Sequence, residues 1–285
     1  MKAIKAFILK NPAISSVGLF ALFFVLSKIE LDAWLVNFMD YQKACYLSGV
    51  LIKGGLSVLM IGVIAWLKLT REGGFTPISQ WKSLWLIWPL VIYSALNGSE
   101  VLDGTYNVNW TDGGLMLLYT LVYVSVGLLE EILIRGMVLP LMLRQWGAAK
   151  GGVYKAVLTS SAIFGLAHLA NLVMGRRDLV STSAQITYAF FFGVFFAALV
   201  LRNKSIWPAV FCHFLFDWAG NFKAVTVGLV YTRVKPAISM EDALFTVAMF
   251  LPLLLIGLFY LRKVEPVWTG GGEAKPLPAG LGEMA

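Results

Sequence analysis

The chain has 285 residues, of which 59% are hydrophobic and 14% are charged, and its formal net charge is +7. Soluble domains contain about 45–50% apolar and about 25% charged residues, so this composition, with a mean hydropathy of +0.76, excludes a soluble globular protein and indicates a polytopic membrane protein. The net charge does not mark a nucleic-acid binder, because the basic residues of membrane proteins gather in cytoplasmic loops near anionic headgroups.

Candidate membrane spans follow one another along most of the chain, since a span needs about 20 mostly apolar residues. In chain order they cover residues 12–29, 46–67, 82–97, 114–139, 153–173, 182–201, 206–224 and 243–261. The third is short, and the fourth stays apolar past Pro140 as far as Leu143. The sequence therefore predicts an all-α polytopic membrane protein with about eight transmembrane helices.

The loops and the two ends of the chain predict its orientation. The basic, apolar N-terminal stretch has no small-x-small cleavage site, so an uncleaved first span is expected. With the N-terminus inside, inside loops hold more Lys and Arg than outside loops, although Arg176, Arg177 and residues 223–235 run against this orientation. We expect both termini in the cytoplasm and a bacterial or archaeal inner membrane as the location. Residues 1–262 are expected to form one membrane domain, and the Gly- and Pro-rich residues 263–285 a disordered tail.

Lys53 and the two cysteines interrupt or flank apolar runs. A lysine inside a span either snorkels to the interface or faces a cavity, and snorkelling is the commoner behaviour. Cys45 and Cys212 are typical of small buried hydrophobic residues, and the chain has neither a disulfide framework nor a CxxC metal knuckle.

The fourth span carries Glu130, Glu131 and Arg135. An ionised side chain at the bilayer centre costs about 2.5–3.5 kcal/mol on insertion scales. Glu131 and Arg135 are four residues apart, so they share a helix face and can pair. Glu130 lies about 100° further round the helix and has no basic residue at i+3 or i+4, which suits a general acid or base. The alternative is that all three residues form one structural polar cluster.

The chain's two histidines lie in two other spans. Phe164 and His168 are four residues apart on one face of the fifth span, and His213 and Asp217 are four apart on the seventh. Asp217 can therefore orient or charge-stabilise His213. Taken alone, a histidine on an apolar helix face is more often a satisfied core residue than a catalytic one.

Taken together, these side chains predict a site buried between the fourth, fifth and seventh helices. Glu130 with His168 would activate a water, and His213 with Asp217 would stabilise an oxyanion. The span boundaries, however, place Glu130 nearer the cytoplasmic half and His168 further outward. HExxH, GxSxG and GxGD motifs do not occur in the sequence, which argues against the usual zincins and the presenilin-like aspartyl proteases.

At these residues the sequence resembles the type II CAAX prenyl protease and bacteriocin-processing (abortive-infection) family of intramembrane proteases. Its EExxxR motif corresponds to Glu130–Arg135, FxxxH to Phe164–His168 and HxxxN/D to His213–Asp217. The three motifs occur in order, each on its own apolar segment, and the resemblance covers roughly residues 114–222. Ile134 stands where many members have an aromatic residue.

The resemblance implies an eight-helix membrane domain and a glutamate-type mechanism. Glu130 with His168 would activate the attacking water, His213 and Asp217 would line the oxyanion site, and Glu131 with Arg135 would position the catalytic helix. Asp217 stands where the eukaryotic-type enzymes have Asn. Because an ionised carboxylate accepts hydrogen bonds and cannot donate them, Asp217 is expected to orient His213 rather than to bind the oxyanion.

The expected function is an intramembrane endopeptidase that cuts near the membrane-anchored end of a protein or peptide, such as a C-terminal sorting tail, a prenylated tail or a leader peptide. The expected partners are this substrate and the lipid bilayer, without nucleic acid. No cofactor or metal is expected; in a metal-dependent hydrolase, Glu130, His168 and His213 would be the ligands. Two further alternatives are a proton-coupled transporter or channel and a non-catalytic immunity or scaffold protein. The transporter has less support, because the motifs do not repeat between the two halves of the chain.

Overall fold

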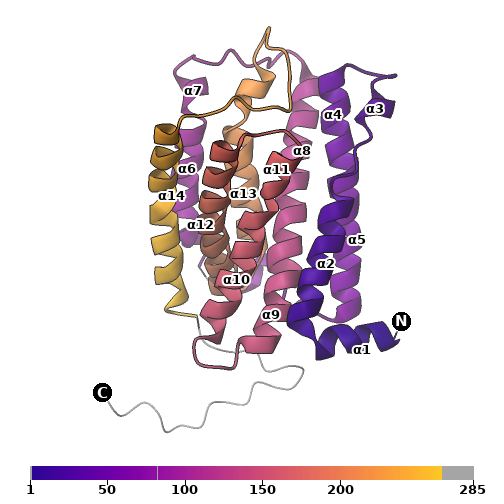
Figure 1. Ribbon diagram of the computed structural model, residues 1–285, viewed down its shortest axis with the longest axis vertical. Helices are drawn as coiled ribbons and strands as arrows, with labels where there is room; N and C mark the ends of the chain where they lie inside the picture. Colours follow the sequence, from indigo (N-terminus) through magenta and orange to yellow (C-terminus); the bar gives the residue numbers. More distant parts are fainter. Residues whose placement is uncertain (1, 82, 265–285) are drawn as a thin grey trace.

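The computed structural model describes residues 2–81 and 83–264, which form a bundle of helices (Figure 1). Within this part of the chain the β-structure is one isolated bridge between Val108 and Thr226. The helices are α1 (Lys2–Lys10), α2 (Pro12–Leu26), α3 (Asp32–Leu35), α4 (Tyr41–Gly49), η1 (Val50–Gly54), α5 (Gly55–Leu67), η2 (Ile78–Gln80), η3 (Leu84–Ile87), α6 (Trp88–Asn97), α7 (Ser99–Leu102), α8 (Gly113–Glu131), η4 (Ile132–Val138), α9 (Leu139–Trp146), α10 (Gly152–Ala167), α11 (Leu169–Val173), α12 (Leu179–Asn203), α13 (Trp207–Ala219), η5 (Phe222–Val225) and α14 (Met240–Leu261). The predicted disordered tail lies outside the described residues, apart from its first two positions.

The all-helical membrane fold predicted from the sequence is confirmed. Five continuous helices among the described residues are long and apolar enough to cross a bilayer, and α1 with α2, which meet at a 116° bend, would make a sixth. The five are Tyr41–Leu67, Gly113–Trp146, Gly152–Val173, Leu179–Asn203 and Met240–Leu261. Helices also occupy the third and seventh predicted spans, but Leu84–Asn97 and Trp207–Ala219 are shorter. The protein is an integral membrane protein, and a total of eight spans stays a prediction.

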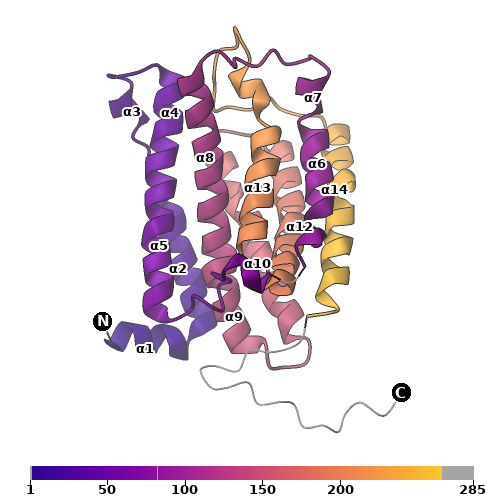
Figure 2. The same ribbon diagram turned by 180° about the vertical axis from the view of Figure 1, so that it is seen from behind.

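The order of the bundle follows from its most buried helix. α12 lies between α14 and α10 and packs extensively against both (Figure 1). From behind, α13 lies between α8 and α6, and it contacts both (Figure 2). Side chains of η4, α9 and α12 form much of the apolar core. Of the three helices that carry the sequence motifs, α10 and α13 therefore pack against α12 directly, while α8 packs against α13 and continues into η4, which contacts α12.

Acidic N-caps begin two of these long helices. The Asp112 carboxylate accepts a hydrogen bond from the Leu115 backbone N–H at 2.9 Å and pairs with Lys43 Nζ at 2.8 Å. The side-chain bond from Lys43, followed by the backbone bond, holds the pKa of Asp112 below its usual range. Asp178 caps α12 by accepting from the backbone N–H groups of Val180 and Ser181. Carboxylates at these ends satisfy N–H groups that have no partner within the helix.

The fourth span runs beyond the predicted end at residue 139, in line with its apolar continuation to Leu143, because the helix continues through η4 and α9 to Trp146. Pro140 lies in the first turn of α9, directly after the π-helical segment η4, where a missing N–H is tolerated. At about 1.5 Å per residue, Glu130 is about 24 Å from Trp146, and His168 is about 24 Å from Gly152, where α10 begins. α9 ends and α10 begins at the same end of the bundle (Figure 1). Glu130 and His168 therefore lie at one level along the bundle. The separation predicted for them came from the span boundary.

Candidate active site

A buried ion pair joins the end of α8 to the π-helical segment η4. The side chains of Glu131 and Arg135 are both 0% exposed, and Arg135 Nη1 donates to Glu131 Oε1 at 2.9 Å. The pair predicted from the spacing of four residues is thereby confirmed. Arg135 Nη2 also donates to the Gly193 carbonyl on α12 at 3.3 Å, and the guanidinium carbon lies 4.6 Å from the Phe164 ring centroid. Arg135 therefore links its own helix to α10 and to α12.

Two glycines allow the helix backbones to approach each other around this pair. A Cβ added at Gly193 would lie 2.7 Å from Ser161 Cβ on α10, and one at Gly127 would lie 3.1 Å from the Phe214 backbone nitrogen on α13. Both distances are too short for a methyl group without movement of a helix. The glycines thus bring α10 to α12, and α13 to α8, at the level of the polar side chains.

We expect Gly193→Ala to destabilise the folded protein by about 1–3 kcal/mol, because the added methyl overpacks the α10–α12 contact. Thermal unfolding of the purified protein in detergent measures this. Gly62→Ala on α5 is the matched control, since no atom lies within 4 Å of the Cβ it would add. Equal unfolding temperatures for the two variants would contradict the close approach of α10 and α12.

His213 is held by the same buried carboxylate. Its Nδ1 lies 2.8 Å from Glu131 Oε1, and since a carboxylate only accepts, Nδ1 is the donor. The ring stacks on Phe196, with centroids 5.4 Å apart and planes at 14°. Its other nitrogen, Nε2, lies 3.5 Å from Asp217 Oδ2 and 3.7 Å from Glu130 Oε2. Glu131 and Phe196 fix the ring, and Nε2 is directed toward Glu130 and Asp217.

This geometry changes the role expected for Asp217. The spacing of four residues predicted that Asp217 orients or charge-stabilises His213. Asp217 Oδ2 lies 3.5 Å from Nε2, near enough to stabilise charge on the ring, whereas Glu131 forms the shorter bond, at Nδ1. The bond between Glu131 and His213 joins residues 82 apart in the sequence, and no spacing rule could have found it.

Glu130 and His168 line one cavity. The Glu130 side chain is 34% exposed, in contrast to its fully buried neighbour Glu131. His168 is the C-cap of α10, and its Nδ1 lies 3.1 Å from the Phe164 carbonyl oxygen. Because that oxygen only accepts, Nδ1 carries the proton, and in the neutral ring Nε2 keeps its lone pair free to accept a hydrogen bond. No direct hydrogen bond joins His168 to Glu130 among the described residues.

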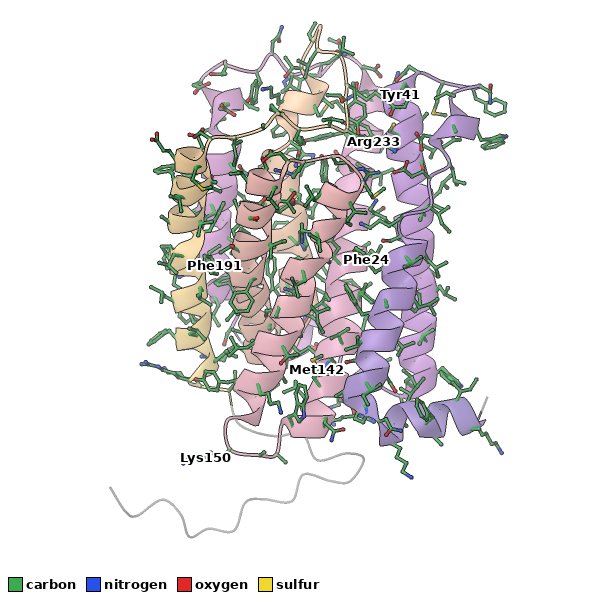
Figure 3. All side chains as sticks on the ribbon, in the orientation of Figure 1. Phe24, Tyr41, Met142, Lys150, Phe191 and Arg233 are labelled. Atoms are coloured by element: carbon green, nitrogen blue, oxygen red, sulfur yellow. The ribbon has the colours of Figure 1, made fainter. Side chains whose placement is uncertain are left out.

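The cavity has a volume of about 260 Å³. All four residues predicted to be catalytic line it, namely Glu130, His168, His213 and Asp217. Aromatic side chains make up much of the remaining wall: Phe20, Phe24, Phe164, Tyr188, Phe192, Phe196 and Phe216. In Figure 3, Phe24 lies roughly midway between the two ends of the bundle. The structure therefore brings together the polar residues of three helices in one chamber, beside a wall of aromatic side chains.

The cavity also contains Lys28 and Lys53. Snorkelling, the commoner behaviour of a lysine in a span, does not describe Lys53, which is directed into the bundle. It lies in the π-helical segment η1, in the middle of the span Tyr41–Leu67. Among the described residues, no three His, Cys, Asp or Glu side chains form a group arranged to hold a metal ion, the trio Glu130, His168 and His213 included.

A family model described as "Rce1-like: Type II CAAX prenyl endopeptidase Rce1-like" matches residues 112–219. The match begins at the N-cap of α8 and ends with α13, so it covers the helices that carry Glu130, His168, His213 and Asp217. It bears out, over this part of the chain, the family resemblance seen in the three sequence motifs. No curated protein and no solved structure matches the chain.

Proposed function

From the match of residues 112–219 to the Rce1-like type II CAAX prenyl endopeptidases, we propose that this membrane protein is a glutamate-type intramembrane endopeptidase. The observation that carries the proposal is the common cavity: the open carboxylate of Glu130, the imidazole of His168 and Nε2 of His213 meet in one chamber of the helix bundle. A general base, a second acceptor for the same water and a donor for the developing charge are the parts that peptide hydrolysis needs.

In the proposed reaction, a water between Glu130 and His168 attacks the carbonyl carbon of the scissile peptide bond. Its proton passes to the Glu130 carboxylate, while Nε2 of His168 accepts the second hydrogen bond and fixes the water's position. The carbonyl π electrons move to the oxygen, giving a tetrahedral oxyanion. When the C–N bond breaks, the proton on Glu130 passes to the leaving amine, and the carboxylate is restored.

We assign the stabilisation of the oxyanion to His213. With Nδ1–H bonded to Glu131, a protonated ring presents a second N–H at Nε2, on the side of the ring that faces Glu130 and Asp217. Glu131 itself has no open face, since it is fully buried between Arg135 and His213. It is thus a positioning residue, and Glu130 is the catalytic carboxylate of the pair.

The same geometry predicts a modest role for the charge of Asp217. Asp217→Asn should lower the cleavage rate less than tenfold, because Glu131 continues to hold the His213 ring. His213→Ala should lower it by about 10²–10³-fold, the usual loss for one oxyanion donor. Steady-state rates of the two reconstituted variants decide this. A rate for Asp217→Asn as low as that of His213→Ala would show that Asp217, not Glu131, orients the ring.

For the substrate, we propose a peptide bond near the membrane-anchored end of a protein or peptide, such as a sorting tail, a prenylated tail or a leader peptide. The apolar chamber inside a membrane-spanning bundle favours a segment that enters from the bilayer. We further propose a bacterial or archaeal cytoplasmic membrane, with both termini in the cytoplasm, from the distribution of Lys and Arg between the loops.

Mapping of protein termini by mass spectrometry tests this proposal. Membrane fractions of cells that carry the wild type are compared with those that carry Glu130→Gln, at matched expression and detergent stability. We expect specific cleaved termini to disappear and uncut precursors to accumulate in the variant, which also identifies the substrate. Identical sets of termini would overturn the protease proposal and favour a transport or scaffold role.

A further inference from the structure

A second cavity, of about 340 Å³, adjoins the catalytic one. Ser27, Lys28, Lys53, Asn171 and Gln185 line both cavities, so these residues form the passage between them. Arg233, which lines the second cavity, lies near the end of the bundle opposite Lys150 (Figure 3). The second cavity therefore leads from that end of the molecule to Glu130 and His168, and we name it the vestibule.

The vestibule is strongly basic. Its lining includes six cations, which are Lys28, Lys53, Arg176, Arg177, Arg233 and Lys235. The one carboxylate of that lining, Glu30, is already bound, because Arg176 donates to its Oε1 and Arg233 Nη1 lies 2.6 Å from its Oε2. Burial lowers the pKa of Lys235. A surplus of positive charge thus faces a space that leads to the candidate active site.

The two lysines of the passage have no anionic partner. Within the described part of the chain, neither Lys28 Nζ nor Lys53 Nζ makes an ion pair or a hydrogen bond to a protein acceptor. Lys28 Nζ lies 4.4 Å from the Phe24 ring centroid. Lysines held inside a bundle without partners are costly, and such groups mark binding sites.

The backbone directs Lys53 into the passage. η1 is a π-helical segment, and π-bulges inside α-helices occur frequently at functional sites. It packs against α8, where Gly49 lies against Val122 and a Cβ at Gly54 would lie 3.6 Å from Ser125 Oγ. Lys53 lies within this segment and lines both cavities, on the interior side of its span.

An amide pair beside the lysines fits a peptide. Asn171 Nδ2 donates to Gln185 Oε1 at 2.8 Å, which leaves Asn171 Oδ1 and Gln185 Nε2 without a side-chain partner among the described residues. The pair therefore offers one acceptor and one donor to the passage, the complement of a peptide N–H and C=O. A lipid phosphate has hydrogen-bond acceptors only, so it would pair with Gln185 Nε2 and leave Asn171 Oδ1 without a donor.

We propose that Lys28 and Lys53 form an anion-binding subsite for a carboxylate of the peptide substrate, in the passage between the vestibule and the catalytic cavity. The carboxylate belongs either to a free chain end or to an Asp or Glu side chain, and it fixes how far the peptide enters beyond Glu130. The assignment of a substrate rests on the proposed peptidase function, whereas the binding of the anion does not require cleavage.

Peptide binding to the full-length protein in nanodiscs of phosphatidylcholine tests the subsite. The probes are three fluorescent apolar decapeptides of one sequence: with a free C-terminal carboxylate, with a C-terminal amide, and with the amide plus one internal Asp. We expect at least one carboxylate peptide to bind about tenfold more tightly than the uncharged amide, as hydrogen bonds to charged groups are the stronger ones. The preferred peptide identifies the source of the carboxylate.

The preference is expected to disappear in Lys53→Met and to weaken in Lys28→Met, while Lys53→Arg restores it. Lys223→Met, at a basic residue that does not line the passage, is the control and should keep it. Glu130→Gln should also retain the preference, so that the loss of cleavage in that variant remains separate from anion binding. Equal binding of all three peptides to the wild type would overturn the subsite and leave the peptidase proposal intact. Loss of the preference when phosphatidylglycerol is added to the nanodisc would overturn the peptide assignment in favour of a lipid headgroup.

Discussion

Glu130→Gln is expected to lower peptide cleavage by about 10²–10⁴-fold, the usual contribution of a general acid–base. The amide keeps the size of the side chain and its place in the cavity, but it cannot take a proton from water. Because Glu130 is 34% exposed to the cavity and its carboxylate lies 3.7 Å from His213 Nε2, beyond hydrogen-bond distance, the substitution should leave the stability of the bundle within about 0.5 kcal/mol of the wild type. Steady-state rates and unfolding temperatures are measured on the same preparation.

Two variants control this result. Glu100→Gln, at an exposed acid in α7, removes one negative charge far from the cavity and should leave the rate unchanged. Glu131→Gln should lower both the rate and the stability, since it breaks bonds to Arg135 and His213. A Glu130→Gln enzyme with wild-type rates would remove Glu130 as the base and leave Asp217, the other carboxylate that lines the cavity, as the remaining candidate.

Arg135→Met is expected to destabilise the protein by about 3–5 kcal/mol, because it leaves the carboxylate of Glu131 buried without its cation. The variant also loses the bond to the Gly193 carbonyl and the contact with the Phe164 ring. Chemical unfolding in detergent measures the loss. The double variant Glu131→Gln with Arg135→Met should recover part of it, since no unpaired charge then remains in the core.

The ion pair between Arg144 and Glu72 is the matched comparison. Arg144 Nη2 lies 2.6 Å from Glu72 Oε1, but both side chains are partly exposed, at 17% and 20%. Arg144→Met should therefore cost no more than about 1 kcal/mol. Equal losses for the two arginine variants would show that the burial of the Glu131–Arg135 pair does not determine its contribution.

Much of the fold was predictable because it rests on local rules. Runs of about 20 apolar residues predicted the helices, and a spacing of four residues predicted the pair of Glu131 and Arg135. The rarity of charged residues inside spans pointed to the three motif helices, and the structure places their side chains around one cavity. These inferences need only the period of a regular α-helix and the cost of buried charge.

The remaining features depend on departures from the regular helix. The π-helical segments η1 and η4 each change the phase of the side chains that follow, and a hydropathy pattern with a fixed period of 3.6 residues does not show this. Three features involve such a segment or a contact between helices. They are the helical continuation past Pro140, the inward direction of Lys53 and the bond between Glu131 and His213. Contacts between helices are set by close approaches such as those at Gly127 and Gly193, which the sequence shows only as glycines.

The most direct test of the account is cleavage of the precursor identified by termini mapping, using the purified protein in liposomes and water enriched in ¹⁸O. The account predicts that one water oxygen appears in the new C-terminal carboxylate of the upstream fragment, at a rate that falls by about 10²–10⁴-fold in Glu130→Gln. If the purified wild type leaves the precursor intact, or if Glu130→Gln incorporates ¹⁸O at the wild-type rate, the glutamate-activated water in this cavity is contradicted.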